Sequence, residues 1–234
     1  MEIDYSKIKV VGFDADDTLW VNETYFREAE MEFGRLLSPY ETVNIIDQEL
    51  FKKEMENLPL YGYGIKSFVL SMVEMALQLS DNRVSNETID AILKIGKDML
   101  NKPVELLEGV EQTLKVLSKH YRLILVTKGD LLDQERKLEK SGLTKYFHHI
   151  EVVSDKHEAN YSGLLHHLDI RPSEFLMIGN SLKSDVLPIV NINAHAIHVP
   201  FQTTWIHEQV KEEETNGKAY KTINSLLDLK GVLY

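Results

Sequence analysis

Two aspartates near the N-terminus have the spacing of a catalytic pair: Asp14 and Asp16 directly follow the apolar run of residues 8–13. If that run is a strand, residues i and i+2 of the extended chain point to the same side, so both carboxylates are predicted to face one pocket. Like charges this close repel unless a cation, a proton or a ligand separates them. The pair therefore indicates a hard metal ion, a shared proton, or both. It suits phosphate chemistry, in which one carboxylate attacks phosphorus and the other handles the leaving-group proton.

A turn is the alternative interpretation of this segment, because Asp side chains bond their own backbone and cap the helix that follows. It accounts for Asp17 and Thr18 but not for Asp14, which ends the apolar run. We expect the Asp17 side chain to point away from the pocket, since neighbours on an extended segment alternate sides.

Polar residues also end two later apolar runs. Thr127, with Lys128 and Gly129 after it, offers a hydroxyl and backbone N–H groups that suit phosphoryl oxygens. Lys156 offers an ammonium that would offset the negative charge of Asp14 and of a phosphoryl group. A solvated lysine at a helix start is the alternative for Lys156.

A possible cation site follows a fourth run. Gly179 lets the chain turn, Asn180 presents a side-chain oxygen, and Asp185 returns one helical turn later. Carboxylate and amide oxygens are ligands of Mg²⁺. The alternative for Asp185 is a charge that interacts with the dipole of the helix N-terminus.

Alternating strand and helix patterns would position these residues. Five short buried strands are predicted, at residues 10–13, 123–127, 150–154, 175–179 and 196–199. Helical patterns cover residues 109–120, 131–140, 157–168 and, after Ser184 as a candidate cap, 185–191. This order predicts an α/β fold with a parallel sheet and right-handed crossovers. In such sheets, sites form at the carboxyl ends of the strands.

A helical insertion interrupts that alternation. The stretch from about residue 22 to residue 103 shows helical spacing of apolar residues and no convincing strand. The predicted boundaries are a core of residues 1–20 and 104–234 and a helical domain of residues 21–103, expected over the carboxyl end of the sheet.

Composition narrows the class of protein. The 234 residues carry a formal net charge of −11, which argues against nucleic acid or an anionic membrane as the main partner. The chain has no cysteine, so disulfides and thiolate chemistry are excluded. The N-terminus lacks the pattern of a signal peptide, and we expect a cytoplasmic protein without a transmembrane segment.

In the order of these motifs, the chain resembles the haloacid dehalogenase-like hydrolase superfamily. The first family signature, Asp-x-Asp-x-Thr after an apolar strand, falls on Asp14 to Thr18. The second, a Ser or Thr, falls on Thr127, and the third, a lysine, on Lys156. The fourth falls on Gly179 to Asp185, with Asn180 in place of the family's first aspartate.

The resemblance implies a Rossmann-like core, an inserted helical cap and a phosphoaspartyl intermediate on Asp14. Asp16 would be the general acid and base. Thr127, Lys128 and Lys156 would bind the phosphoryl group. The implied cofactor is Mg²⁺, bound by Asp14, the Asp16 carbonyl and two residues of the fourth motif, which are Asn180 and Asp185.

Four other functions remain open. A halide-releasing enzyme would use the same nucleophile, but family dehalogenases resembling this chain lack the second aspartate, so Asp16 argues against it. A phosphomutase or phosphonate-cleaving enzyme differs mainly in the cap. A catalytically weakened binding or regulatory protein is suggested by Asn180, because an amide in place of a carboxylate lowers metal affinity unless Asp185 compensates.

The expected substrate is a small phosphate monoester, because a large cap would exclude most protein substrates. Residues 60–66 could supply specificity through Tyr61, Tyr63 and Lys66, although a turn between helices is the alternative. A second loop, residues 201–205, is expected to border the pocket. A monomer is the default expectation.

Overall fold

The computed structural model describes residues 5–203 and 205–233, and the chain forms two compact units. The core unit comprises Met1–Glu23, Val104–Lys128 and Gln134–Tyr234, and the helical unit comprises Thr24–Pro103 and Gly129–Asp133. The expected boundaries put residues 21–23 in the insertion and residues 129–133 in the core. In the structure, residues 21–23 belong to the core unit and residues 129–133 to the helical unit.

A parallel six-stranded sheet forms the centre of the core unit, in the order β3-β2-β1-β4-β5-β6. Its strands are β1 (Val10–Phe13), β2 (Arg122–Lys128), β3 (His149–Val153), β4 (Phe175–Gly179), β5 (His195–His198) and β6 (Lys221–Thr222). All five predicted strands are confirmed to within a few residues. The sequence prediction missed β6, which has only two residues, both exposed, and so lacks an apolar pattern. Because β1 pairs with both β2 and β4, its end lies where the strand order reverses.

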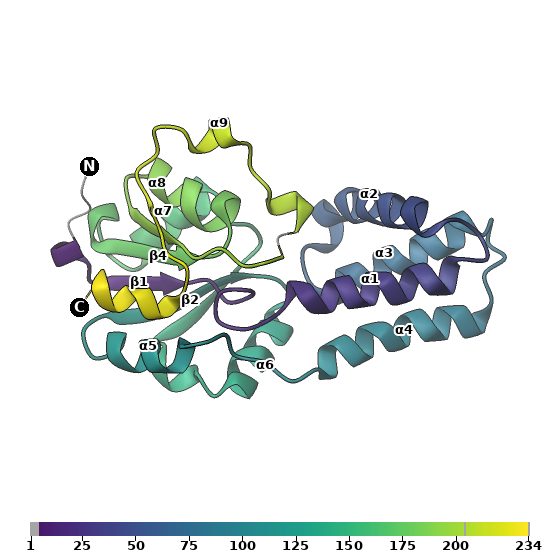
Figure 1. Cartoon of the computed structure of the whole chain (residues 1–234), viewed down its shortest axis with the longest axis horizontal. Coiled ribbons are helices and arrows are strands. Elements are labelled where there is room, and N and C mark those ends of the chain that lie inside the picture. The colour runs from purple at the N-terminus through teal and green to yellow at the C-terminus, as the bar shows by residue number, and fades with distance from the viewer. Residues whose placement is uncertain (1–4, 204, 234) are drawn as a thin grey trace. The chain divides into compact units, whose positions relative to one another are not determined.

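Helices cover both faces of the sheet in the core unit (Figure 1). They are α5 (Val110–Leu117), α6 (Leu131–Ser141), α7 (Glu158–His167) and α8 (Leu187–Asn191), whereas the short helix α9 (Glu212–Thr215) lies in the connection between β5 and β6. Short helical turns are η1 (Tyr5–Lys7), η2 (Thr144–Tyr146), η3 (Pro172–Glu174), η4 (Leu182–Val186), η5 (Ile206–Glu208) and η6 (Leu226–Gly231). Helices α5 and α6 pack with η6 in one apolar cluster, and α7 and α8 in the other. The predicted Rossmann-like α/β class is therefore confirmed.

Four helices make up most of the helical unit (Figure 1). They are α1 (Glu23–Leu37), α2 (Val43–Tyr61), α3 (Ile65–Leu79) and α4 (Asn86–Asn101). Their apolar faces enclose a separate core that includes Phe33, Ile46, Phe68, Met72 and Ile92. The helical spacing in the sequence thus corresponds to real helices with a shared interior.

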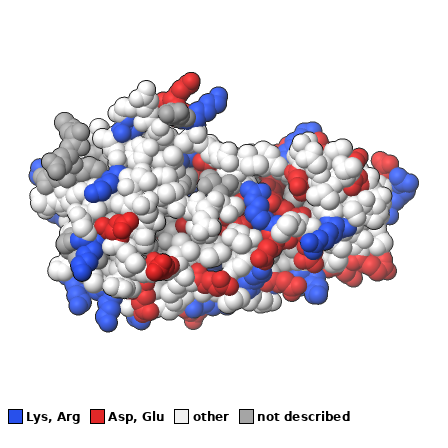
Figure 2. Space-filling view, viewed as in Figure 1, with Lys and Arg blue, Asp and Glu red and all other residues white. Residues whose placement is uncertain are grey.

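Surface charge is mixed over the described residues, with acidic and basic side chains interspersed on the face shown in Figure 2. In residues 5–203 and 205–233, none of the helices combines the length and the apolar character needed to cross a bilayer.

Candidate active site

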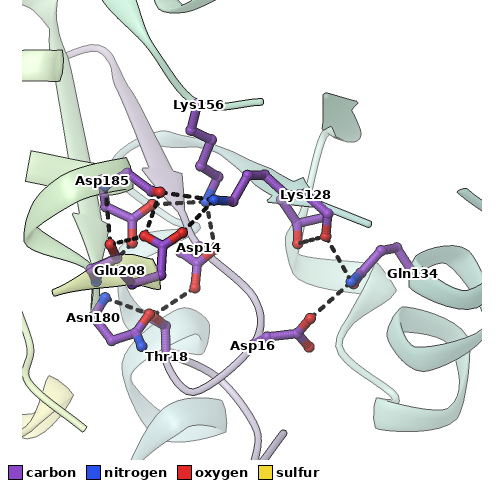
Figure 3. A network of polar contacts seen from close by, with 12 residues as sticks. Asp14, Asp16, Thr18, Lys128, Gln134, Lys156, Asn180, Asp185 and Glu208 are labelled. Atoms are coloured by element: carbon purple, nitrogen blue, oxygen red, sulfur yellow. Dashed lines mark hydrogen bonds and ion pairs between the residues drawn. The ribbon is translucent and has the colours of Figure 1, made fainter. Parts of the chain in front are cut away.

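The carboxyl ends of β1 and β3 and the turn after β4 bring Asp14, Lys156 and Asp185 together (Figure 3). Lys156 Nζ lies 2.5 Å from Asp14 Oδ1 and 2.7 Å from Asp185 Oδ1. These residues are 142 and 29 positions apart from Lys156 in sequence, so the sheet topology alone unites them. Lys156 is therefore not the solvated lysine of the alternative interpretation.

Burial sets the electrostatics of this triad, since Asp14, Lys156 and Asp185 are 7%, 4% and 1% exposed. Burial raises the pKa of Asp14, and nearby Asp185 adds to this rise, whereas the Lys156 ammonium lowers it. Burial opposes the charge of Lys156, but the two carboxylates outweigh it and hold the Lys156 pKa well above its usual value. The triad keeps one buried cation between two buried carboxylates.

Thr18 and Asn180 bind the other side of the Asp14 carboxylate. The single hydroxyl proton of Thr18 is donated to Asp14 Oδ2 at 2.9 Å, and the Asn180 backbone N–H donates to Thr18 Oγ1 at 3.0 Å. With its amide nitrogen turned toward these acceptors, Asn180 lies 3.2 Å from Asp14 Oδ2, 3.2 Å from Thr18 Oγ1 and 3.3 Å from the Asp16 carbonyl oxygen. Asn180 thus contacts both halves of the Asp14–Asp16 motif.

The Asp16 carboxylate has different partners from Asp14. It accepts hydrogen bonds from Trp20, Gln134 and Lys137, and in Figure 3 it points toward Gln134. Strand β1 ends at Phe13, so the extended geometry that predicted two carboxylates facing one pocket does not continue as far as Asp16. The two carboxylates share no hydrogen-bond partner among the described residues, and that they face one pocket stays a prediction.

Lys128 lies at the end of β2 and is paired with a residue that the sequence did not point to. Its ammonium is 2.6 Å from Glu208 Oε1 and donates to Ser184 Oγ at 2.9 Å. Burial would raise the pKa of Glu208, but Lys128 and two serine hydroxyls lower it to about 2. Thr127 is buried, with 1% of its surface exposed. Its hydroxyl donates to the Lys128 carbonyl at 3.2 Å.

Glu208 lies in η5, just after the loop of residues 201–205 that was expected to border the pocket. Thr204 of that loop lies outside the described residues. The only sequence signal for Glu208 is its place after the last predicted strand.

The π-helical turn η4 contains Asp185 and positions it. The cap is Ser181, whose side chain accepts from the Ser184 backbone N–H, so the prediction of Ser184 as the cap is wrong. Asp185 Oδ2 accepts from the Ser181 backbone N–H at 3.0 Å. A β-carbon at Gly179 would overlap the Asp185 carboxylate, which explains a glycine at the end of β4.

Asp17 points away from the triad, as expected. Its backbone is left-handed, with φ of 62°, and its carboxylate accepts from the backbone N–H groups of Asn22 and Glu23 at the start of α1. Asp17 therefore fastens the chain where it leaves the core unit.

Replacing Asp17 with asparagine is expected to weaken the pH dependence of stability. Burial raises the pKa of Asp17 to about 8, whereas the pKa of an aspartate in an unfolded chain is about 3.9. The folded protein therefore binds this proton more tightly, and the contribution of Asp17 to wild-type stability is lost as the pH rises from about 4 to about 8. Asparagine keeps an oxygen acceptor and tolerates this φ but does not titrate. Thermal unfolding at about pH 5 and about pH 8 measures the difference.

Asp81→Asn is the matched control, because Asp81 also has a positive φ, 51°, but its side chain is 85% exposed. This control should follow the wild-type pH profile. If Asp17→Asn loses as much stability as the wild type over the same pH range, the role given to Asp17 is wrong.

The donor set around Asn180 fits a hard cation. Asp14 Oδ2 and the Asp16 carbonyl oxygen lie 3.2 Å and 3.3 Å from the Asn180 amide nitrogen, and turning that amide over would present its oxygen beside them in the nitrogen's place. Oxygen donors of this kind suit Mg²⁺. No group of three or more His, Cys, Asp or Glu side chains in the described part of the chain could hold a metal, so a site here depends on the carbonyl and the amide. Both oxygens of Asp185 already bind Lys156 and Ser181.

The turn between α2 and α3 accounts for most of the segment from Tyr61 to Lys66. Gly62 and Gly64 have φ of 71° and 111°. Within the helical unit, the Tyr61 hydroxyl donates to Glu74 at 2.8 Å, and Lys66 Nζ lies 3.0 Å from both carboxylate oxygens of Asp130. The contacts of this segment are those of the turn alternative, and a part in specificity stays a prediction.

Comparison with known proteins places the chain in a family. A family model described as haloacid dehalogenase-like hydrolase matches residues 8–193. The chain belongs to the haloacid dehalogenase-like hydrolases. This haloacid dehalogenase-like hydrolase is similar to a solved haloacid dehalogenase-like family hydrolase from Xanthomonas campestris, with a TM-score of 0.86 and 36% identity over 97% of this chain and 91% of that chain.

Two relatives of this haloacid dehalogenase-like hydrolase are named as phosphatases. The N-acylneuraminate-9-phosphatase of Homo sapiens is 25% identical over 240 residues, which cover 97% of this chain and 94% of the relative. The glyceraldehyde 3-phosphate phosphatase of Methanothermobacter thermautotrophicus is 23% identical over 238 residues, which cover 97% and 100% of the two chains.

Proposed function

We propose that this hydrolase is a Mg²⁺-dependent phosphatase that acts on small phosphate monoesters through a phosphoaspartyl intermediate on Asp14. One observation carries the proposal: the buried Asp14 carboxylate at the end of β1 is held between the Lys156 ammonium and the Thr18 hydroxyl. Such a carboxylate has a fixed direction of attack, and its cationic partner can offset charge as it develops on the phosphoryl group.

In the first step, an oxygen of Asp14 attacks phosphorus, the bond to the ester oxygen breaks, and Asp16 gives its proton to that oxygen. In the second step, Asp16 accepts a proton from water as the water oxygen attacks phosphorus and the Asp14–phosphorus bond breaks. The products are an alcohol and inorganic phosphate, and Asp14 and Asp16 return to their starting protonation.

Three residues are proposed to bind the phosphoryl group: Thr127, Lys128 and Lys156. Lys156 lies next to the attacking oxygen, and Lys128 follows Thr127 at the end of β2. Mg²⁺ bound by Asp14, the Asp16 carbonyl and Asn180 would neutralise part of the phosphoryl charge. Asp185 is proposed to support the ion indirectly, by holding Lys156 in place. The helical unit is the proposed cap domain.

The substrate class follows from the relatives. Their names place one phosphate on a neuraminate and one on glyceraldehyde, which are both small polyhydroxylated carbonyl compounds. We therefore propose a phosphorylated sugar or sugar acid. The cytoplasm is the proposed location.

The test is hydrolysis of p-nitrophenyl phosphate, followed by a panel of sugar phosphates, nucleotides and small organic phosphates, with and without Mg²⁺. Release of inorganic phosphate that depends on Mg²⁺ is the expected result. Absence of turnover across the whole panel in both conditions would contradict the proposal and favour a binding protein. Halide release from 2-chloropropionate without metal would instead identify a dehalogenase.

Replacing Asn180 with aspartate is expected to strengthen Mg²⁺ binding and to lower the thermal stability of the metal-free protein. An added carboxylate beside Asp14 raises the affinity for a hard cation, by about 10-fold. Without the cation, the new charge repels Asp14 and replaces an amide that donates to it. Thermal unfolding over a Mg²⁺ titration measures both effects.

Asn193→Asp is the matched control, because Asn193 is exposed and follows α8. This variant should behave as the wild type throughout the titration. An unchanged or weaker response of Asn180→Asp to Mg²⁺ would place the ion elsewhere.

A further inference from the structure

The Asp16 carboxylate is surrounded by three donors whose roles the reaction scheme leaves open. Trp20 Nε1 and Lys137 Nζ lie 2.7 Å and 2.6 Å from Asp16 Oδ1. Gln134 Nε2 donates to Asp16 Oδ2 at 2.8 Å (Figure 3). Both carboxylate oxygens are thus fixed by strong, short contacts from the loop after β1 and from α6.

The orientation of Gln134 is itself determined. Its Nε2 also donates to the Lys128 carbonyl at 3.0 Å, so the nitrogen faces two acceptors. Its Oε1 is buried and has no hydrogen-bond partner among the described residues, and the residue is 3% exposed. Turning the amide would lose both bonds of Nε2, so Gln134 can serve Asp16 only as a donor.

Lys137 stands one helical turn after Gln134, so the two side chains leave the same face of α6. The Lys137 side chain is 16% exposed, and its ammonium also lies 3.2 Å from Asn22 Oδ1. A cation with two such partners is held in one place. Helix α6 therefore presents a rigid pair of donors to Asp16.

In-line displacement at phosphorus places the nucleophile and the leaving group on opposite sides. A general acid must therefore lie across from Asp14, on the side of the leaving group. In Figure 3 the Asp16 carboxylate points toward Gln134, away from the cluster of Asp14, Lys156 and Asp185. An aspartate on a loop can rotate freely unless it is held, and a small displacement of a proton donor costs much of its effect.

We propose that Gln134 and Lys137 are positioning residues that hold Asp16 on the leaving-group side for proton transfer. This assignment rests on the proposed function. A positioning role predicts that loss of Gln134 or Lys137 impairs mainly the transfer of a proton to the leaving group. A purely structural role would impair turnover of all substrates alike.

The experiment compares phenyl phosphate with p-nitrophenyl phosphate, two aryl esters of similar shape. Phenolate is the more basic leaving group and depends more on a general acid. Gln134→Met and Lys137→Met are expected to lower kcat for phenyl phosphate about 10-fold more than kcat for p-nitrophenyl phosphate. Asp16→Asn should give a larger difference in the same direction, and Lys137→Arg, which keeps the cation, should restore most of the loss.

Lys140→Met is the matched control, since Lys140 is an exposed lysine on the same helix. It should leave both rates unchanged. Equal losses on the two esters, or no loss, in folded Gln134→Met and Lys137→Met would overturn the assignment while leaving the proposed function in place. If the wild type hydrolysed neither ester nor any other phosphate, the proposed function would fail and this assignment with it. Should Lys137→Met fail to fold, Gln134→Met and Lys137→Arg decide the question.

Discussion

Replacing Asp14 with asparagine is expected to reduce phosphatase turnover by about 10⁴-fold or more, because the attacking oxygen is lost. The fold should persist. Asparagine has nearly the shape of aspartate and can still accept from Lys156, which keeps Asp185 as its counter-charge. Phosphate release measures the first effect, and thermal unfolding measures the second.

Asp17→Asn is the comparison for this variant, since it makes the same substitution three positions later in the same loop. Asp17 faces the backbone of Asn22 and Glu23, so most of the activity should remain. Turnover by folded Asp14→Asn at a wild-type rate would show that another group attacks phosphorus.

Replacing Lys156 with methionine is expected to have the largest effect on stability. The ammonium is buried between Asp14 and Asp185, and its loss leaves two buried carboxylates without their shared counter-charge. Breaking such a buried pair costs about 3–5 kcal/mol. Chemical denaturation of the metal-free protein measures this free energy of unfolding.

A second substitution separates loss of charge balance from loss of packing. Lys156→Met combined with Asp185→Asn removes one of the stranded carboxylates and should regain a substantial part of the lost stability. If the double variant is no more stable than Lys156→Met alone, packing of the lysine stem accounts for the effect. Lys183→Met is the control, because Lys183 reaches His207 at the surface.

Most of the fold could be predicted from the sequence because short apolar runs at regular intervals are a local signal. The strand containing Phe13 and the turn at Gly179 both came from such runs. The order of strands and helices then determined that Asp14 and Lys156 would lie at one edge of the sheet.

The partners of the site residues could not be predicted in this way. Lys128 and Glu208 are 80 positions apart, and Asp16 and Lys137 are 121 positions apart. A surface lysine and a surface glutamate have the same local sequence pattern as a buried pair, so only the folded chain distinguishes them. The partners of Asp16 were missed for a related reason, since β1 ends three residues before it and the chain there is no longer a strand.

The helical and core units are joined by four chain crossings, two of which bound the five-residue segment Gly129–Asp133. Lys128 precedes that segment and Gln134 follows it, and the hydrogen bond from Gln134 Nε2 to the Lys128 carbonyl closes its base. The same Gln134 nitrogen donates to Asp16 Oδ2, so the base of this loop and the Asp16 carboxylate share one hydrogen-bonding group. The ends of the segment Gly129–Asp133 are therefore tied to the Asp16 carboxylate through a single side-chain amide, that of Gln134.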